Sequence, residues 1–251
     1  MTVARAVLFS DLDGAFLDQR TYRPGAAGGW LNALSRAGVT VVFCSAKTRA
    51  EMAHLQRQLG VEAPFIVENG AAVVADRRVA ACFGLTYRQV RAGLVDAASE
   101  VGAKVRGYGD MTPAEISGLT GLSWEDAARA QEREYSVTFL LEGSASRLGE
   151  ALERRGLRMV RGALFYSAQG QHDKGTAVRY LIEELGPDRS YAIGDFDNDL
   201  PMLEAVDSPM LVQRPGGIFA DLAVEGLVRL EGVGPEGWIL GAQRILADLS
   251  E

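Results

Sequence analysis

Four aspartates and one serine follow short apolar segments of the chain directly. Apolar segments of this length are typical of buried strands in a parallel sheet. Ligands bind at the carboxyl ends of the strands in such sheets, so polar residues that follow three different strands are expected to converge on one site. The residues are, in chain order, Asp11, Asp13, Ser45, Asp195 and Asp199.

The expected site would contain five carboxylates when Asp197 is included. Like charges at short range repel, so some of these groups must bind protons unless a cation lies among them. An all-oxygen ligand set, in a chain with only two histidines and two cysteines, favours Mg²⁺ over a zinc site built on histidine. The alternative, that aspartates only cap turns and helices, explains single residues better than a set at three strand ends.

Two further features indicate an anionic ligand. Ser45 and Ala46 stand between an expected strand and an expected helix, where backbone N–H groups and a hydroxyl bind anions. Lys174 opens another expected helix, although the helix dipole disfavours a cation there. The alternatives are a plain serine cap and a solvated lysine. Carboxylates, Mg²⁺, a lysine and a helix N-terminus together predict phosphoryl transfer, with a carboxylate as nucleophile.

The surrounding segments predict an α/β fold with a doubly wound parallel sheet, because strands and helices alternate. The expected strands are 3–10, 39–44, 65–67, 190–193, 210–212 and 227–230, with a hairpin over 71–74 and 79–83. The expected helices are 24–37, 48–59, 175–185, 200–206 and 238–249. We assign residues 1–83 and 168–251 to this Rossmann-like catalytic core.

The middle of the chain, residues 84–167, has a different pattern and predicts an inserted α+β cap. Its expected strands are 104–108, 135–141, 157–161 and 163–167. Its expected helices are 87–101, 112–119, 123–131 and 145–155. Gly84 and Gly170 lie near the two junctions, and we expect them to absorb a closing rotation of the cap over the substrate.

Composition limits the kind of partner. The 251 residues are 47% apolar and carry a net charge of −7, so neither a nucleic acid nor an anionic membrane surface is an expected partner. No apolar run is long enough to span a membrane, and the N-terminus does not resemble a signal peptide. Two cysteines do not form a disulfide framework. These features predict a cytoplasmic protein, whose oligomeric state stays open.

Four motifs resemble those of the haloacid dehalogenase superfamily of phosphatases, in the family's order. They are Asp11-Leu12-Asp13-Gly14, Ser45, Lys174, and Gly194-Asp195 with Asn198-Asp199. The insert resembles the cap of the Cof-like branch. Within that branch, the segments 45–51, 67–71, 133–136 and 173–175 are similar to the mannosyl-3-phosphoglycerate phosphatases. Sugar-phosphate phosphatases share some of these segments.

The resemblance implies a role for each motif residue. Asp11 is the nucleophile that forms an aspartyl-phosphate, and Asp13 is the general acid and base. Mg²⁺ is held by Asp11, the Asp13 carbonyl and Asp195, and Asp199 is either a fourth ligand or a residue that orients the ligands. The phosphate-binding residues are Ser45, Ala46, Lys174 and Asn198.

The implied reaction is hydrolysis of mannosyl-3-phosphoglycerate to mannosylglycerate and phosphate. The substrate is thus a small phosphorylated sugar–glycerate compound with a carboxylate, for which Lys47 and Arg133 are candidate cations. The other candidate substrate-binding residues are Glu68, Asn69, Ser136, Thr138 and Gln171.

The chain departs from the family pattern at Ala15, where threonine is usual, and at Phe196-Asp197. Neither change removes a group that the reaction needs. We therefore expect both changes to affect the reaction rate and the metal affinity and not the type of reaction. Two rival functions stay open: a phosphatase of broader sugar-phosphate specificity, and a non-catalytic sensor that binds sugar phosphates. The retained motifs argue against the sensor.

Overall fold

A computed structural model of the chain describes residues 5–162 and 164–250. Its larger sheet has eight strands in the order β12-β11-β10-β1-β2-β3-β4-β5, and neighbouring strands from β12 to β3 are parallel. The parallel strands are β1 (Ala6–Ser10), β2 (Val39–Cys44), β3 (Phe65–Val67), β10 (Arg189–Gly194), β11 (Ser208–Gln213) and β12 (Val228–Val233). The hairpin β4 (Ala72–Ala75) and β5 (Arg78–Cys82) adds two antiparallel strands at one edge.

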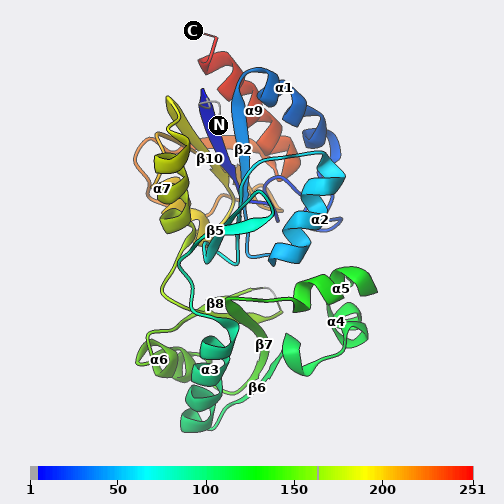
Figure 1. The fold of residues 1–251 in the computed structure, drawn as a ribbon, viewed down its shortest axis with the longest axis vertical. Helices are drawn as coiled ribbons and strands as arrows, with labels where there is room; N and C mark the ends of the chain where they lie inside the picture. Colours follow the sequence, from blue (N-terminus) through cyan, green and yellow to red (C-terminus); the bar gives the residue numbers. More distant parts are fainter. Residues whose placement is uncertain (1–4, 163, 251) are drawn as a thin grey trace.

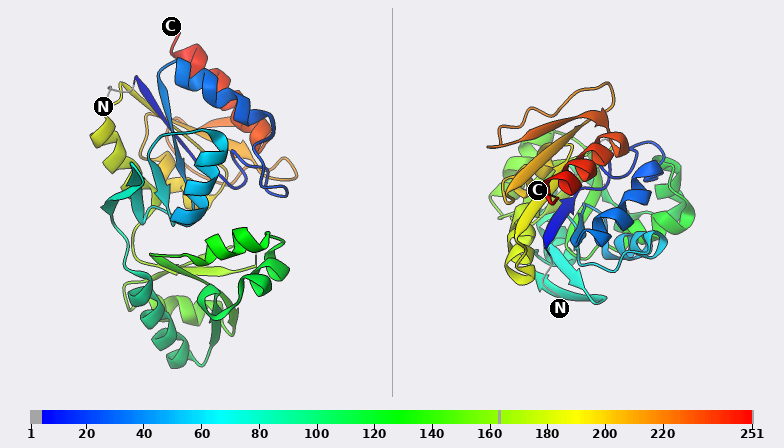
Figure 2. Two further views of the ribbon diagram at one scale, coloured as in Figure 1. Left: turned by 45° about the vertical axis from the view of Figure 1, so that its right-hand side comes forward. Right: turned by 90° about the horizontal axis from the view of Figure 1, so that it is seen from above.

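Helices cover both faces of this sheet, as Figures 1 and 2 show. One face packs against η1 (Gly25–Gly29), α1 (Trp30–Arg36), α2 (Arg49–Leu59) and α9 (Pro235–Asp248). The other face packs against α7 (Lys174–Leu185) and α8 (Leu200–Leu203), and a short η3 (Asp197–Asp199) precedes α8. The central strands read as continuous apolar runs because both faces are buried. We call this sheet and its helices the core.

The second sheet is antiparallel, with the order β6-β7-β9-β8, and we call it and its helices the cap. Its strands are β6 (Lys104–Gly107), β7 (Ser136–Glu142), β8 (Arg158–Arg161) and β9 (Tyr166–Gln169). One face packs on α3 (Tyr87–Val101) and α6 (Ala145–Glu153). After η2 (Tyr108–Asp110), helices α4 (Pro113–Thr120) and α5 (Trp124–Gln131) form a separate small cluster that reaches α2 of the core.

The other face of the cap sheet is turned toward the core (Figure 1). Alternation along β7 produces this face: Val137 and Phe139 are buried against α3 and α6, so Ser136 and Thr138 project to the opposite side. The cap thus presents polar side chains above the core sheet.

The structure confirms the α/β class and corrects several expected boundaries. The helix expected at 24–37 starts with a 3₁₀ turn and becomes α-helical only at Trp30, because the segment 25–29 is Gly-Ala-Ala-Gly-Gly. The helix expected at 200–206 ends at Leu203, and the strand expected at 163–167 is β9 at Tyr166–Gln169. Residues 1–4 and 163 lie outside the described residues. No helix within the described residues has the length and apolarity that crossing a membrane requires.

The two expected junction glycines lie where the chain passes between core and cap. Gly84 separates β5 from α3, and a Cβ there would lie 2.9 Å from the Cβ of Ala71 and 3.1 Å from that of Tyr135. Gly170 separates β9 from α7, and a Cβ there would lie 3.3 Å from Nδ1 of His172. Both positions are closely packed in this conformation, and their role as hinges stays a prediction.

Candidate active site

The candidate active site lies where the sheet order reverses. From β1 the chain winds outward through β2 and β3 on one side and through β10, β11 and β12 on the other. Loops after β1 and β10 therefore separate at their carboxyl ends and leave a crevice. Asp11 follows β1, and Asp195 follows β10. Gly14 permits their close approach: its φ is +97°, and a Cβ there would lie 2.6 Å from Oδ2 of Asp195.

Lys174 connects two of the aspartates. Its Nζ lies 2.6 Å from Oδ1 of Asp11 and 2.6 Å from Oδ1 of Asp199, and its side chain is fully buried. Burial alone would lower the pKa of Lys174, but the two facing carboxylates raise that pKa well above its usual value. The lysine is therefore a fixed positive charge in the site. This excludes the alternative of a solvated surface lysine.

The loop after β10 is stabilised by the carboxylate of Asp199, the last residue of the η3 turn. Oδ2 of Asp199 accepts hydrogen bonds from the backbone N–H of Asp195 at 2.9 Å and of Phe196 at 3.2 Å. Asp199 thus fixes the loop with one oxygen and faces Lys174 with the other. The expected fifth carboxylate, Asp197, does not join this cluster: its side chain is exposed, because the η3 turn directs it outward.

Asp11, Asp195 and Asp199 fit a divalent cation. Each is buried and offers one carboxylate oxygen, and the three oxygens lie within 4.8 Å of one another. Burial raises the pKa of Asp11 well above its ordinary value, and burial together with the charge of Asp199 raises the pKa of Asp195 to about 7. A bound cation would offset this electrostatic cost, and oxygen-only donors suit Mg²⁺.

The backbone of Asp11 has a support that the sequence did not reveal. Ser10 donates its hydroxyl proton to the Asp11 carbonyl at 2.7 Å, and Nε1 of Trp238 donates to the same hydroxyl oxygen at 2.9 Å. Ser10 and Trp238 are buried. They belong to opposite ends of the chain, so only the tertiary fold could bring them together.

Asp13 pairs with Lys47 on the other side of Asp11. The two groups are 2.9 Å apart, and their side chains are 35% and 18% exposed, so the pair is partly accessible to solvent. Lys47 also lies over the ring of Tyr22, 5.3 Å from its centroid. Burial opposes the charge of Lys47, but Asp13 and Glu51 together raise its pKa. Ser45 is buried at the end of β2 and accepts a hydrogen bond from the Lys47 backbone N–H at 3.2 Å.

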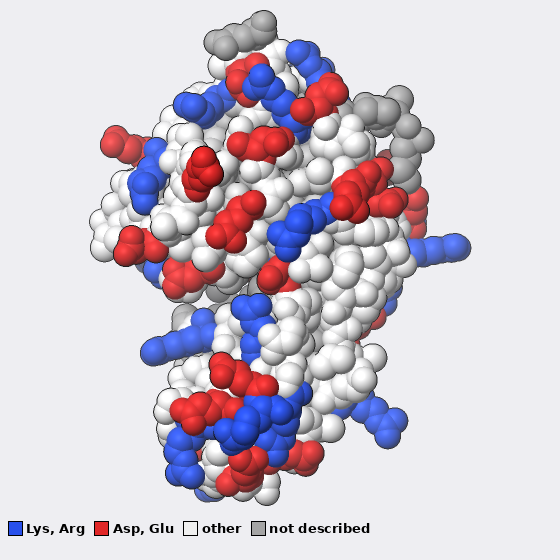
Figure 3. Space-filling view, turned by 90° about the vertical axis from the view of Figure 1, so that its left-hand side faces the viewer, with Lys and Arg blue, Asp and Glu red and all other residues white. Residues whose placement is uncertain are grey.

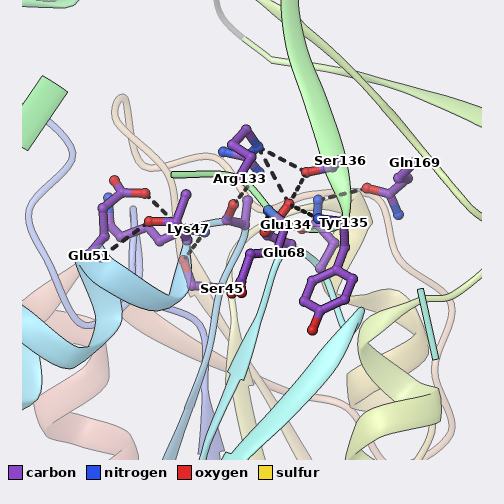
Figure 4. A network of polar contacts seen from close by, with 12 residues as sticks. Ser45, Lys47, Glu51, Glu68, Arg133, Glu134, Tyr135, Ser136 and Gln169 are labelled. Carbon is purple, nitrogen blue, oxygen red and sulfur yellow. Dashed lines mark hydrogen bonds and ion pairs between the residues drawn. The ribbon is translucent and has the colours of Figure 1, made fainter. Parts of the chain in front are cut away.

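Glu68 joins the core to the cap (Figure 4). Its carboxylate has no solvent exposure and accepts hydrogen bonds from the backbone N–H of Glu134 at 2.7 Å and of Tyr135 at 3.1 Å. It also accepts the hydroxyl of Ser136 and lies 3.6 Å from Nε of Arg133. Glu68 therefore organises the cap segment 133–136 above the site.

Arg133 carries this contact to the loop after β2. Its Nη2 donates to the Ala46 carbonyl at 2.8 Å, and its Nε donates to the Ser136 hydroxyl at 2.9 Å. A neighbouring bidentate pair between Arg49 and Glu134, at 2.9 Å for both contacts, adds a second link between core and cap. The carbonyl of Ala46 therefore accepts the hydrogen bond that links the loop after β2 to the cap.

Asn69 and Gln169 form a third link. Nδ2 of Asn69 donates to Oε1 of Gln169 at 3.0 Å, and both side chains are buried. Nε2 of Gln169 donates to the carbonyl of His172 at 3.3 Å, while Nε2 of His172 donates to the carbonyl of Glu68 at 3.1 Å. The expected sugar-binding residue Asn69 is therefore fixed in place, next to a cavity of about 170 Å³ that it lines together with Lys174 and Asn198.

The structure does not bring together all of the residues expected from the sequence. Gln171 is exposed on the segment between β9 and α7, and Thr138 is half-buried on the core-facing side of β7. Neither has a side-chain hydrogen bond within the described part of the chain. Sequence reasoning also missed the polar residues Tyr22, Arg158, Gln169 and His172. Of these, only Arg158 lies in a strand expected from the sequence, 157–161, whereas the expected strand 163–167 ends before Gln169.

Comparison with known proteins agrees with this geometry. A family model described as haloacid dehalogenase-like hydrolase matches residues 8–110 and 166–214. A glucosyl-3-phosphoglycerate/mannosyl-3-phosphoglycerate phosphatase of Methanococcoides burtonii is 34% identical, over 92% of this chain and 94% of that protein. A mannosyl-3-phosphoglycerate phosphatase of Pyrococcus horikoshii is 33% identical, over 82% of this chain and 90% of that protein.

A solved structure shares the fold. It is a phosphatase of the haloalkanoate enzyme superfamily from Bacteroides thetaiotaomicron, with a TM-score of 0.71 and 16% identity, covering 98% of this chain and 96% of that one. The family match covers the strands that carry the aspartates as well as Lys174. The chain therefore belongs to the haloacid dehalogenase-like hydrolases and is a phosphoric monoester hydrolase.

Proposed function

We propose that this enzyme hydrolyses mannosyl-3-phosphoglycerate, or its glucosyl counterpart, to the glycosylglycerate and phosphate. The observation that carries the proposal is the buried group of Lys174, Asp11 and Asp199 at the reversal of the sheet, directly below the polar face of the cap. The relatives at 33–34% identity support the substrate class. Phosphate release from a small soluble compound also agrees with the expected cytoplasmic location.

In the proposed mechanism, Asp11 attacks phosphorus in line and forms an aspartyl-phosphate, which water then hydrolyses. Asp13 gives a proton to the leaving glycerate oxygen and later takes one from the water. Lys174, Ser45 and the Ala46 backbone are assigned to the phosphoryl oxygens, and Asn198 lies beside them in the same cavity wall as Lys174.

Mg²⁺ is proposed as the cofactor. Asp11, Asp195, Asp199 and the Asp13 carbonyl would hold it, and when bound it would neutralise charge between the attacking carboxylate and the phosphate. The ammonium of Lys174 contributes a further positive charge that is fixed by two ion pairs.

The substrate assignment is tested by phosphate release. Mannosyl- and glucosyl-3-phosphoglycerate are compared with glucose 6-phosphate and 3-phosphoglycerate, with and without Mg²⁺, and Asp11→Asn provides the blank. We expect a strong preference for the glycosyl phosphoglycerates that is lost without Mg²⁺ and in the variant. Similar slow turnover of all four compounds would instead support the broader sugar-phosphate phosphatase.

A further inference from the structure

The cavity between cap and core contains a cation that the proposed mechanism does not use. The cavity has a volume of about 170 Å³ and opens beside Lys174. Its polar lining combines core and cap residues: Asn69, Arg158, Gln169, Lys174, Asp197 and Asn198. Figure 3 shows Lys and Arg side chains on the cap side of the hollow between the two parts of the molecule, and Asp and Glu side chains on its core side. A substrate bound through its phosphate at Lys174 would therefore extend toward Arg158.

Arg158 is directed at this cavity by the alternation of β8. Met159 packs against the cap helices on the far side of the sheet, so Arg158 and Val160 project toward the core, and both line the cavity. Nη1 of Arg158 donates to the carbonyl of His172 at 3.4 Å. This contact attaches the side chain to the cavity wall and uses one of its five N–H donors.

Three other cations near the site already face carboxylates, and a fourth, Arg214, lies over the ring of Phe196 at 4.2 Å from its centroid and does not line this cavity. Lys47 lies 2.9 Å from Asp13, and Nε of Arg133 lies 3.6 Å from Glu68. Lys174 is shared between two aspartates. In the described ranges 5–162 and 164–250, Arg158 forms no ion pair with a carboxylate. Asp173 also lines the cavity, but its carboxylate caps α7 by accepting from the Thr176 backbone N–H at 2.8 Å and the Thr176 hydroxyl at 3.0 Å.

We propose that Arg158 is a specificity-determining residue that binds the carboxylate of the phosphoglycerate part of the substrate. The assignment rests on the proposed function. A phosphoglycerate ester carries two anionic groups separated by one carbon chain, and the cavity offers a cation at the core end and another at the cap end. A guanidinium is the side chain best suited to a carboxylate, because its fork binds both oxygens at once.

The test compares two substrates that differ only in the carboxylate. One is mannosyl-3-phosphoglycerate, and the other is the same glycoside of glycerol 3-phosphate, in which a hydroxymethyl group replaces the carboxylate. For Arg158→Ala we expect kcat/KM to fall about 10- to 100-fold on the first substrate, mainly through KM, since a charged hydrogen-bonding pair is lost. On the second substrate the change should stay within about twofold.

Two further variants control for structure and charge. Arg161→Ala removes an exposed arginine from the same strand, and we expect changes within about twofold on both substrates. Arg158→Lys keeps the charge and should restore part of the preference, and thermal unfolding of each variant checks that the cap is folded. Equal losses of kcat/KM on both substrates, or a preference for the carboxylated substrate that survives in Arg158→Ala, would overturn the role of Arg158 and leave the proposed function standing. A wild-type enzyme that does not prefer the carboxylated substrate would contradict the proposed function itself and the role of Arg158 with it.

Discussion

Replacing Glu68 with glutamine should weaken closure of the cap without changing the volume of the side chain. Oε1 of Glu68 accepts a hydrogen bond from the backbone N–H of Glu134. Oε2 accepts two hydrogen bonds, one from the backbone N–H of Tyr135 and one from the hydroxyl of Ser136. Glutamine has one carbonyl oxygen, so its NH₂ group must face a donor on one of the two sides. Losing one charge-assisted hydrogen bond costs about 1.5–3 kcal/mol, a factor of roughly 10 to 150 in the equilibrium between closed and open cap.

Two assays report this change. First, kcat/KM for phosphate release should fall by up to that factor, because we expect the cap to close over the substrate before turnover. Second, hydrogen exchange at the amides of Glu134 and Tyr135 should accelerate, since both amides donate to Glu68. Glu142→Gln is the matched control, because that side chain is 80% exposed and lies on β7 of the cap. Unchanged kcat/KM together with unchanged exchange at both amides would refute the role assigned to Glu68.

Three further substitutions test other parts of the account. Lys174→Met should lower kcat about 10²- to 10³-fold, because a preorganised cation facing Asp11 is lost, and phosphate release with circular dichroism as a folding control measures this. Burial lowers the pKa of His172, so the folded protein resists its protonation while the unfolded chain takes up a proton near pH 6.5. The unfolding free energy should therefore be unaffected by His172 above pH 6.5 and decrease below it, and urea unfolding of His172→Gln should show a smaller decrease. Gly70→Ala should lower the unfolding free energy by about 4 kcal/mol or more, because φ at Gly70 is +95° and the new Cβ would lie 1.9 Å from the Asp173 carbonyl oxygen. Gly60→Ala is the matched control: φ there is +65°, but the Cβ would meet no atom within 4 Å, so we expect a loss of about 1 kcal/mol in the same urea unfolding assay.

The sequence alone predicted the core and its catalytic edge because both depend on local patterns. Each apolar strand is followed directly by its functional residue, so strand recognition already places Asp11, Ser45 and Asp195 at one edge. Lys174 was identified because its type and position disagreed with the helix dipole, and its burial between two carboxylates explains that disagreement.

The links between core and cap could not be predicted in the same way. Glu68 and Asn69 adopt positive φ values of 47° and 60°, which no simple turn rule assigns to a glutamate. Their partners Ser136 and Gln169 are 68 and 100 residues away along the chain. Such contacts depend on how the cap is placed over the core, so local periodicity carries little information about them.

Asp197 shows the limit of counting charges in a motif. The run 195–199 contains three aspartates: Asp195 is buried directly after β10, and within the η3 turn Asp199 is buried while Asp197 is exposed. A turn of about three residues per revolution decides which carboxylates face inward. Asp197 lines the neighbouring cavity instead, so counting the aspartates of the motif overestimated the charge of the buried carboxylate cluster.

The central claim is that Asp11 forms a covalent intermediate, and the stereochemical course at phosphorus tests it most directly. The substrate is prepared as a thiophosphate whose two non-bridging oxygens are different isotopes in a known configuration, hydrolysis takes place in water that carries the third isotope, and the configuration of the released chiral thiophosphate is determined. Each in-line displacement inverts phosphorus, so attack by Asp11 followed by attack of water predicts net retention. Net inversion would show a single direct attack by water and would contradict the account.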